Sequence, residues 1–494
     1  MSAALIVIFA TMLIALALGI AARRGRTMDM EQWTVGGRGF GTIFVFLLSA
    51  GEIYTTFTFL GGSGWAYGRG APAFYILGYG SLAYVISYWL LPALWRYSNA
   101  HRLYTQPDLF ARKYNSTGLG VLVALVGVVA LVPYMVLQLT GLGIIVSTAS
   151  YGAISSTTAI WIGAAVVTVY VIVSGVHGSA WTSVLKDILI LAVVVFLGIY
   201  LPVHYYGGLQ PMFEAIDAAK PGFLTLAPRG QSIIWFDSTV LLTGLGFYMW
   251  PHSMGAVFTA RSETVFRRNA VFMPLYQIIL LFAFLVGFAA ILQVPGLKGT
   301  AADLSLFRIS LKTFDPWFIG VIGAAGVLTA LVPGSMILMT AAAFLSNNIV
   351  RVLRPGMSDQ SVALLARALV PVVALVSVLF TLRGGTTIVE LLLMGYSFVT
   401  QLFPALIGAL MRRNPVTTPG AFAGILVGVA AVAVLSLTRA TIGSVLPFLP
   451  VPLYDLNVGI IAMVLNLIAL VVVSAVTRGT PAIAGADGRQ IAGK

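Results

Sequence analysis

Long apolar segments recur along the whole chain, and they constrain its fold more than any other feature. A transmembrane helix needs about 20 consecutive, mainly apolar residues. Here 59% of the 494 residues are hydrophobic and only 9% are charged, whereas a soluble protein averages about 25% charged residues. No soluble fold could bury this much apolar surface. The sequence therefore predicts an all-α, polytopic membrane protein.

We predict about thirteen transmembrane helices, joined mainly by short polar connections. Basic residues follow the first span instead of preceding it, which argues against a cleaved signal peptide. Two outer connections are long enough to hold short surface helices. The predicted spans are 3–22, 41–66, 72–95, 119–147, 157–174, 184–204, 236–258, 271–293, 317–345, 361–382, 388–411, 418–438 and 456–477.

Lys and Arg residues gather on one side of the predicted bilayer. When the connections alternate between sides, eighteen of these residues fall on one side and eight on the other. Cytoplasmic loops carry the excess of positive charge, which predicts an external N-terminus and a cytoplasmic C-terminus. The net charge of +13 reflects this bias, because the chain has no long basic run that would indicate nucleic-acid binding.

Two predicted spans contain residues that interrupt a helix. The span 41–66 breaks near Ala50 and Gly51, and the span 236–258, five spans later, contains Pro251. Interrupted helices at corresponding positions of two halves indicate an inverted-repeat transporter with its site at the repeat interface. The predicted domains are a leading helix and loop (1–40), the first repeat (41–204), an extracellular connection (205–235), the second repeat (236–411), two trailing helices (412–477) and a cytoplasmic tail (478–494).

Glu52 is a lone carboxylate in the first interrupted span. A charge in the bilayer costs roughly 2.5–3.5 kcal/mol on insertion scales. Gly51 precedes it, and Thr55 and Thr56 follow it, so a helix that breaks here would offer polar groups to a ligand. We predict a substrate-binding or ion-coupling site, although an ion pair with a buried Arg or Lys is the structural alternative.

Other polar and aromatic residues deep in apolar spans are further candidates. His252 could donate, accept or carry a proton, or it could satisfy a nearby backbone carbonyl. Ser335 could offer its hydroxyl to an ion or bond back to its own helix. Gln138 and Gln401 could contact a ligand or bond to neighbouring helices, and Trp250 is a further candidate for lining the site.

Lys186 and Asp187 stand near the predicted cytoplasmic start of the span 184–204. Adjacent helical residues do not face each other, so the two need not pair. We expect Lys186 to extend its ammonium to the membrane interface. Asp187 could line an inner exit route for a cation, or it could be an interfacial charge favoured by the helix dipole.

Several motifs resemble those of the solute:sodium symporter family, and the similarity runs from about residue 3 to 478. These motifs are GGRGFG (36–41), SAGE (49–52) with TFLGGSGWAYGRG (58–70), QLTGLG (138–143), SAWTSVLKD (179–187), WPH (250–252) and SNNIVR (346–351). The resemblance implies a LeuT-type five-plus-five inverted repeat with one leading and two trailing helices, in the inner (plasma) membrane of a bacterium. The SVLKD and LVPGSM stretches resemble the bacterial monocarboxylate permease branch.

The resemblance also implies where the cation site lies. It places Glu52 at the acidic position of the broken helix, and it places Ala50 and Ile53 where backbone carbonyls bind the coupling cation. Two adjacent hydroxyl residues usually complete that site, but the matching positions here are Val332 and Pro333. A Na⁺ site without these oxygens is weakened, so we hypothesise coupling to H⁺ through Glu52 or His252.

An acid that lies near the inner sodium route in the family is Ser183 here. Asp187, one helical turn later on the same face, could replace that acid. Asp187 and Ser335 are therefore expected to take part in cation coupling.

These observations predict a secondary active symporter that imports a small organic solute with a cation, Na⁺ or H⁺, by alternating access. The expected solute is a monocarboxylate of the pyruvate, lactate or acetate type, and the alternative is a proline-like amino acid. The rival classes are a channel, which would need a continuous pore, and a sensor, which would need an added cytoplasmic domain. We expect no enzymatic activity and no cofactor besides the coupling ion, because the four histidines lie in different segments. The expected partners are the solute, the cation and the lipid bilayer.

Overall fold

The computed structural model describes residues 3–51, 53–438 and 441–478, and these residues form an all-helical protein. In the described part of the chain, the only β-type pairing is an isolated bridge between Phe40 and Ala260. The prediction of an all-α fold is confirmed. Our predictions for Glu52 and for most of the tail concern residues outside the described ranges.

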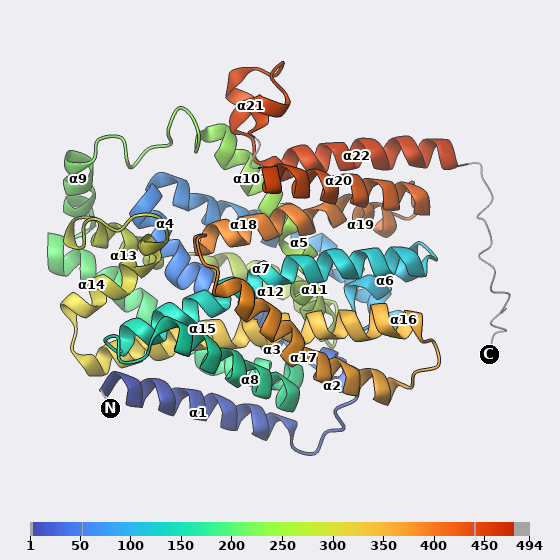
Figure 1. Cartoon of the computed structure of the whole chain (residues 1–494), viewed down its shortest axis with the longest axis horizontal. Helices are drawn as coiled ribbons and strands as arrows, with labels where there is room; N and C mark the ends of the chain where they lie inside the picture. The colour runs from blue at the N-terminus through green and yellow to red at the C-terminus, as the bar shows by residue number, and fades with distance from the viewer. Residues whose placement is uncertain (1–2, 52, 439–440, 479–494) are drawn as a thin grey trace.

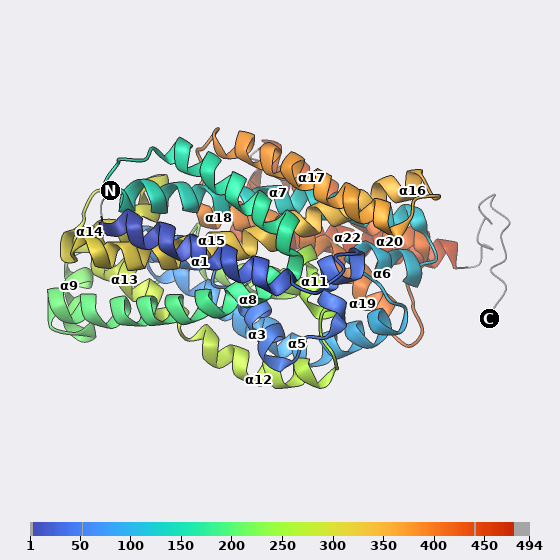
Figure 2. The same cartoon turned by 90° about the horizontal axis from the view of Figure 1, so that it is seen from below.

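Most of the long helices run roughly parallel to one another and form a single bundle (Figure 1). α1 lies along one edge of the bundle, and α20 and α22 lie along the opposite edge. Figure 2 shows α17 on one flank and α12 on the other. The helices are α1 (Ala3–Arg23), α2 (Met30–Val35), α3 (Thr42–Gly51), α4 (Gly62–Arg69), α5 (Tyr75–Ala100), α6 (Gln106–Lys113), α7 (Thr117–Ala149), α8 (Ser156–Tyr206), α9 (Leu209–Ala219), α10 (Ile233–Gly246), α11 (Pro251–Phe258), α12 (Thr264–Gln277), α13 (Leu280–Gln293), α14 (Ser305–Thr313), α15 (Pro316–Ala343), α16 (Arg351–Leu353), α17 (Asp359–Thr381), α18 (Ile388–Val399), α19 (Phe403–Leu410), α20 (Thr418–Thr438), α21 (Ile442–Val445) and α22 (Val458–Thr477).

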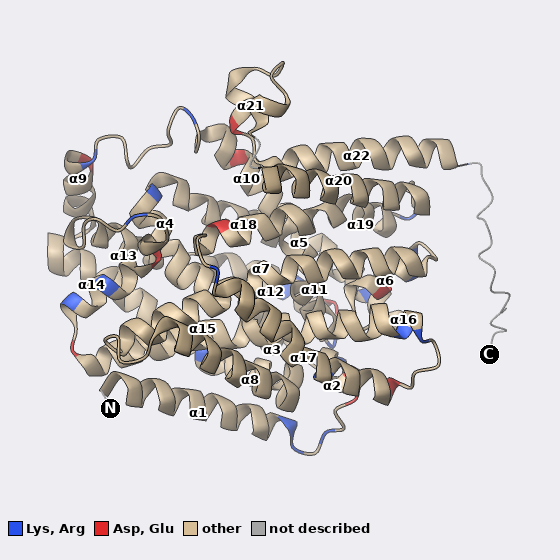
Figure 3. Cartoon of the chain, in the orientation of Figure 1, with Lys and Arg blue, Asp and Glu red and all other residues tan. Residues whose placement is uncertain are grey.

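Charged residues lie mainly toward the two ends of the bundle and on the connections (Figure 3). α9 and α14 lie at one end, together with the start of α1, and α6 and α16 lie at the other end. This distribution is the one that a bilayer around the apolar middle of the bundle requires. The two long connections contain α9 and α14, so the prediction of short helices in them is confirmed.

Ten helices of the described chain are long and apolar enough to span a membrane, or eleven when α10 and α11 are counted as one bent span. The predicted number of about thirteen therefore stays a prediction. α8 accounts for part of the difference, because its 51 residues contain a non-helical Gly175 (φ 53°, ψ −150°) and cover two predicted spans. α3 is also too short to count as a membrane-spanning helix, because it ends after 10 residues at the first interruption.

Two interrupted helices lie at the centre of the fold. The first is α3, which ends at Gly51, followed by η2 (Phe57–Gly61) and α4. The second is α10 with η4 (Phe247–Met249), which meets α11 at a bend of 48°. Trp250 is extended at this bend, and Pro251 opens α11, where its missing N–H is not needed. α11 packs against α3, so the two interrupted helices are neighbours.

α15 forms the buried core of the bundle, with 94% of its most apolar window inside the protein. It packs against α1, α7 and α8. Small residues permit this close approach, as in other membrane helix pairs. A Cβ on Gly320 would lie only 2.7 Å from the Ala4 Cα atom. The core helix is thus fixed beside the interrupted helix α3, which it also contacts.

Candidate functional site

The break after α3 is closed by short backbone turns. The Ala50 carbonyl accepts hydrogen bonds from the Ile53 and Tyr54 amides, each at 3.0 Å, and the Ile53 carbonyl accepts one from the Thr55 amide at 3.0 Å. Thr55 Oγ1 accepts a bond from the Phe57 amide at 3.0 Å. The carbonyls of Ala50 and Ile53, predicted as cation ligands, therefore already accept the backbone hydrogen bonds that form the turn.

A buried lysine points into this break from α8. Lys186 is fully buried, and its Nζ donates to the Tyr54 carbonyl at 3.3 Å. A Cβ built on Gly51 would lie 3.5 Å from Lys186 Nζ and 3.8 Å from Ser183 Oγ. The ammonium therefore lies against the first interrupted helix, at the end of α3.

Asp187 neutralises this ammonium. Its Oδ1 atom lies 2.8 Å from Lys186 Nζ, and the residue is 5% exposed. The ring of Tyr276 in α12 lies edge-on to the Tyr54 ring, with centroids 4.6 Å apart. The Tyr54 hydroxyl donates to the Tyr276 carbonyl at 2.6 Å. One polar cluster thus joins the break to α8 and α12.

The expectation that Lys186 extends to the membrane interface was wrong. Its side chain is fully buried and pairs with the neighbouring Asp187. The physical reason is the position of the break in α8: the helix resumes directly after Gly175, so Lys186 lies about 16 Å along it at 1.5 Å per residue. The long lysine side chain can then fold back onto the adjacent carboxylate.

α15 faces the same break with apolar groups. Val332 Cγ1 would lie 3.8 Å from a Cβ on Gly51. Ser335, a predicted cation ligand, donates to the Val332 carbonyl at 2.6 Å and shares a 2.7 Å hydrogen bond with Ser179 of α8. The Ser335 hydroxyl thus joins α15 to α8.

Thr56 and Gln138, which are 82 residues apart in sequence, meet beside the break. Gln138 Oε1 accepts from Thr56 Oγ1 at 2.7 Å and from the Thr56 amide at 3.4 Å. Because an amide N–H only donates, this contact fixes which end of the Gln138 side chain faces Thr56. Gln138 Nε2 is then left buried without a hydrogen-bond partner among the described residues.

Trp250 and His252 belong to a buried aromatic cluster. The Tyr134 ring centroid lies 4.8 Å from that of Trp250 and 5.0 Å from that of His252. Tyr396 of α18 lies 5.3 Å from Trp250. Sequence reasoning missed Tyr134, although it stands one helical turn before Gln138 on the same face of α7, which is a signal that could have found it.

Gln401 makes its contacts at a different place. Its Nε2 donates to the Ser397 carbonyl at 3.0 Å and to the Gly459 carbonyl at 3.2 Å. Asn466 of α22 donates to the Gln401 carbonyl at 2.7 Å. Gln401 is part of η7 (Thr400–Leu402), and its contacts join η7 to α22, which is the interhelical role given above as its alternative.

Two large cavities lie near the ends of the bundle. One, of about 810 Å³, is lined by α7 residues such as Val136 and Thr140 and by Asp303 of η5 (Gly299–Leu304). The other, of about 830 Å³, lies beside α6 and α16. The predicted binding residues that the structure describes line neither of these two cavities.

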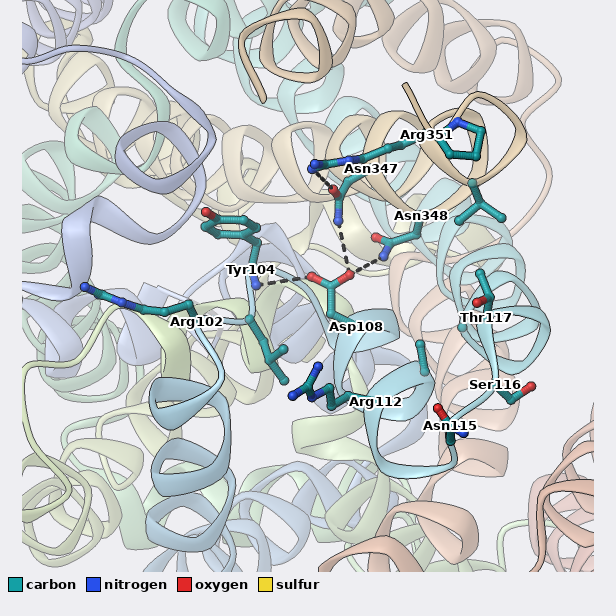
Figure 4. Close-up of a pocket in the computed structure, with 15 residues that line it drawn as sticks. Arg102, Tyr104, Asp108, Arg112, Asn115, Ser116, Thr117, Asn347, Asn348 and Arg351 are labelled. Atoms are coloured by element: carbon teal, nitrogen blue, oxygen red, sulfur yellow. Dashed lines mark hydrogen bonds between the residues drawn. The ribbon is translucent and has the colours of Figure 1, made fainter. Parts of the chain in front are cut away.

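The cavity beside α6 contains the SNNIVR motif (Figure 4). Asp108 lies at its centre, and its Oδ1 accepts from Asn347 Nδ2 at 3.1 Å and from Asn348 Nδ2 at 2.6 Å. The Tyr104 amide donates to Asp108 Oδ2 at 3.2 Å. Burial raises the pKa of Asp108, and hydrogen bonds from Thr105, Asn348 and the Tyr104 amide oppose the rise. The motif therefore ties α6 to η6 (Phe344–Val350).

Asp303 should give the stability of the protein a pH dependence. It lies in the connection 294–316, outside the predicted spans, and burial raises its pKa from 3.8 to about 7. Its Oδ2 accepts from the Ile388 amide at 3.1 Å. Because the pKa is raised in the folded state, its stabilising contribution is complete below about pH 4 and is lost as the pH rises through about 7. This contribution is at most about 4 kcal/mol.

The substitution Asp303→Asn tests this dependence. Thermal unfolding in detergent should show a wild-type melting temperature that falls from pH 4 to pH 7 relative to that of the variant. Glu390, whose charge also raises the pKa of Asp303, should be left intact in both proteins. A constant difference between the two melting temperatures over this range would contradict the assignment.

Comparison with known proteins gives the relatives of this chain. A family model described as the sodium:solute symporter family matches residues 33–428. The chain is 63% identical to the uncharacterized symporter YhjB of Bacillus subtilis (strain 168), over 97% of this chain and 98% of that protein. It is 29% identical to a monocarboxylate transport permease protein of Rhizobium johnstonii, over 83% of this chain and 84% of that protein.

Solved structures share the fold. A Na⁺-coupled sialic acid symporter in a substrate-bound outward-open state matches with a TM-score of 0.77 and 18% identity, over 96% of this chain and 98% of the other. Mhp1, a nucleobase-cation-symport-1 family transporter in a closed conformation, matches with a TM-score of 0.57 and 12% identity, over 90% and 95%. The predicted LeuT-type fold is confirmed. The family match covers most of the sequence and, with the 63% identical symporter, shows that the chain belongs to the sodium:solute symporter family.

Proposed function

We propose that this protein is a secondary active symporter that imports a small monocarboxylate, of the pyruvate, lactate or acetate type, together with a cation. Family membership supports the symporter class, and the 29% identical monocarboxylate permease supports the solute class. We further propose the division into repeats 41–204 and 236–411, which brings the two interrupted helices to corresponding positions. Alternating access would then come from the movement of one helix group against the other.

The observation that carries the solute class is the unused amide donor of Gln138. A buried polar atom without a partner is rare in a folded protein and calls for an explanation. Gln138 Nε2 is such an atom among the described residues, and it lies beside Thr56 at the interrupted helix. A carboxylate oxygen is the acceptor that this N–H₂ group lacks. We therefore place the solute carboxylate near Gln138, with Trp250, His252, Thr55, Thr56 and Glu52 as further candidates for contact.

The first evidence on the coupling ion is the family to which the chain belongs. Membership in the sodium:solute symporter family and likeness to a Na⁺-coupled symporter support Na⁺. The residues Glu52 and His252 remain our candidates for a proton carrier. Uptake measured separately against Na⁺ and pH gradients distinguishes the two ions.

The substitution Gln138→Leu should weaken solute binding. Leu keeps a similar volume but removes the unused donor and the bond to Thr56, so we expect KM to rise about 10-fold, which corresponds to about 1.4 kcal/mol. Gln401→Leu is the matched control, because the Gln401 amide donates to the carbonyls of Ser397, one turn earlier, and of Gly459 in α22. It should lower the melting temperature and leave KM unchanged. Equal KM values for wild type and Gln138→Leu would show that Gln138 does not bind the solute.

Uptake into proteoliposomes tests the function itself. A panel of labelled pyruvate, lactate, acetate, proline and other amino acids should be offered, with an imposed Na⁺ or pH gradient. We expect gradient-driven uptake of at least one monocarboxylate and its loss in Glu52→Gln, a substitution chosen from the sequence alone. Uptake of proline with no uptake of monocarboxylates would support the alternative, an amino-acid symporter, which a 26% identical osmoregulated proline transporter of Bacillus subtilis makes the main rival.

A further inference from the structure

The cavity beside α6 is lined by arginines from three parts of the chain. They are Arg102 in the connection before α6, Arg112 in α6 and Arg351 at the start of α16. Figure 4 shows them on different sides of Asp108. The cavity volume of about 830 Å³ lies within the range of about 300–1,000 Å³ that is typical of small-molecule sites. The cavity therefore has room for a charged group and the molecule that carries it.

The side-chain acceptors of Asp108 and of the SNNIVR asparagines are already occupied. Asp108 Oδ1 accepts from both asparagine side chains, and its Oδ2 accepts from the Tyr104 and Thr105 amides at 3.2 and 3.0 Å. Asn347 Oδ1 accepts from an arginine at 3.4 Å, and Asn348 Oδ1 accepts from Thr105 Oγ1 at 2.9 Å. Unused guanidinium N–H groups remain, because each arginine carries five donors. This cavity therefore suits a ligand that is rich in acceptors.

The guanidinium groups are only partly neutralised. Arg102 Nη1 lies 3.1 Å from Glu31 Oε1, an oxygen that a second arginine also contacts, at 3.0 Å. Arg351 Nη1 lies 2.8 Å from Asp359 Oδ1. Arg112 forms no ion pair with a carboxylate of the described residues. Four guanidiniums thus stand against three carboxylates, the one at the centre of the cavity included, and the cavity keeps a positive charge that attracts an anion.

The N-terminus of α7 adds to this positive potential. Ser116 caps the helix by accepting from the Leu119 amide at 3.2 Å. The Thr117 amide, at the first position of the helix, has no comparable partner among the described residues. The first turn of a helix carries a partial positive charge and favours anions. Ser116 and Thr117 both line the cavity, so the helix and the arginines act on the same space.

We propose that the cavity beside α6 binds a phosphate group, carried by the headgroup of an anionic lipid or by a small soluble phosphate. Arginine forms paired, charge-assisted hydrogen bonds with phosphate oxygens, and basic pockets between membrane helices bind phosphate headgroups. Leu353, which follows the lining residue Val352, is 76% exposed, so an acyl chain could cover it while the headgroup occupies the cavity. The proposal depends on neither the transported solute nor the coupling ion.

Thermal-shift titrations of the purified protein in detergent test this proposal and separate the two sources. Potassium phosphate is compared with KCl at equal ionic strength, and dioctanoyl phosphatidic acid is compared with dioctanoyl phosphatidylcholine. The proteins are wild type, Arg112→Gln and Arg268→Gln. Arg112→Gln removes a lining charge that has no ion pair. Arg268 is an exposed arginine of α12 that does not line the cavity, so Arg268→Gln is the matched control.

We expect phosphatidic acid, inorganic phosphate or both to raise the melting temperature of the wild type. The apparent Kd should be roughly 10-fold weaker in Arg112→Gln, which loses a charged hydrogen bond, and unchanged in Arg268→Gln. A response to phosphatidic acid alone identifies a lipid headgroup, and a response to inorganic phosphate identifies a soluble phosphate; both support the proposal. Arg102→Gln, at a side chain that is 68% exposed, has the same expected effect and replaces Arg112→Gln should that variant not fold.

Two results would overturn the proposal. The first is a wild type that responds to neither phosphate ligand beyond its control. The second is an equal response of wild type, the cavity variant and Arg268→Gln, because a general attraction of anions to a basic surface does not depend on the cavity.

Discussion

Lys186→Met is expected to destabilise the protein by about 3–5 kcal/mol, the cost of removing one partner from a buried ion pair. Lys186 is fully buried, and its Nζ lies 2.8 Å from Asp187 Oδ1. The substitution leaves the Asp187 carboxylate uncompensated inside the bundle, and it also removes the donor to the Tyr54 carbonyl. The effect should appear as a lower melting temperature in detergent and as a loss of uptake.

The double substitution Lys186→Met/Asp187→Asn separates loss of the pair from loss of packing. When both charges are removed, no buried charge is left alone, and replacement of whole buried pairs is often close to neutral. We expect the double variant to recover at least half of the stability lost by Lys186→Met. Asp187→Asn alone should destabilise the protein, because it leaves the ammonium without its counter-ion. Independent, additive effects of the two substitutions would show that the pair does not contribute as a unit.

Gly287→Val should be nearly as damaging, because it forces two helices of the fold apart. A Cβ at Gly287 of α13 would lie 2.1 Å from the Ser63 carbonyl oxygen of α4 and 2.9 Å from the Ala66 Cβ atom. A backbone oxygen cannot move aside as a flexible side chain can. Overpacking of this kind costs about 1–3 kcal/mol or more. Since α4 continues the first interrupted helix, we also expect uptake to fall at least 10-fold.

Gly255→Ala is the matched control for this prediction. Gly255 is a helical glycine of α11, and a Cβ there meets no atom within 4 Å. Alanine favours helix over glycine by about 1 kcal/mol, so the control should melt at the same temperature as the wild type or higher. Equal melting temperatures for Gly287→Val and wild type would show that α4 and α13 are not in close contact in the membrane.

The fold could be predicted from the sequence because its main causes are local. Apolar segments of about 20 residues indicate spans, and Gly51 and Pro251 mark the two interruptions, because glycine and proline disfavour a continuous helix. The number of spans is harder to predict, because a polar stretch can remain helical within the bundle. Ser179 and Ser183 lie in such a stretch: Ser179 bonds to Ser335, and Ser183 bonds to the Ser179 carbonyl. These bonds satisfy the polar groups inside the bundle, so the stretch 175–183 need not be the exposed connection that its polarity suggested.

The residues around the break were predicted less completely, because their roles depend on tertiary contacts. The pairing of Thr56 with Gln138 joins residues that are 82 positions apart, and no local pattern indicates it. Lys186 was assigned to the membrane interface because its span appeared to begin at residue 184, whereas α8 resumes just after Gly175. Gln401 resembled Gln138 in sequence as a polar residue in an apolar span, but its contacts are with Asn466 and Gly459 of the trailing helix α22.

Counterflow in proteoliposomes tests the central proposal, a monocarboxylate carrier, most directly. Vesicles with purified protein are loaded with unlabelled lactate and diluted into a trace of labelled lactate, pyruvate or acetate, without any ion gradient. A carrier exchanges the internal solute for the external one, so we predict a transient accumulation of label above its equilibrium level, which empty vesicles do not show. Label that only equilibrates would indicate a channel. Accumulation of proline in proline-loaded vesicles, with no accumulation of the three monocarboxylates, would contradict the proposal.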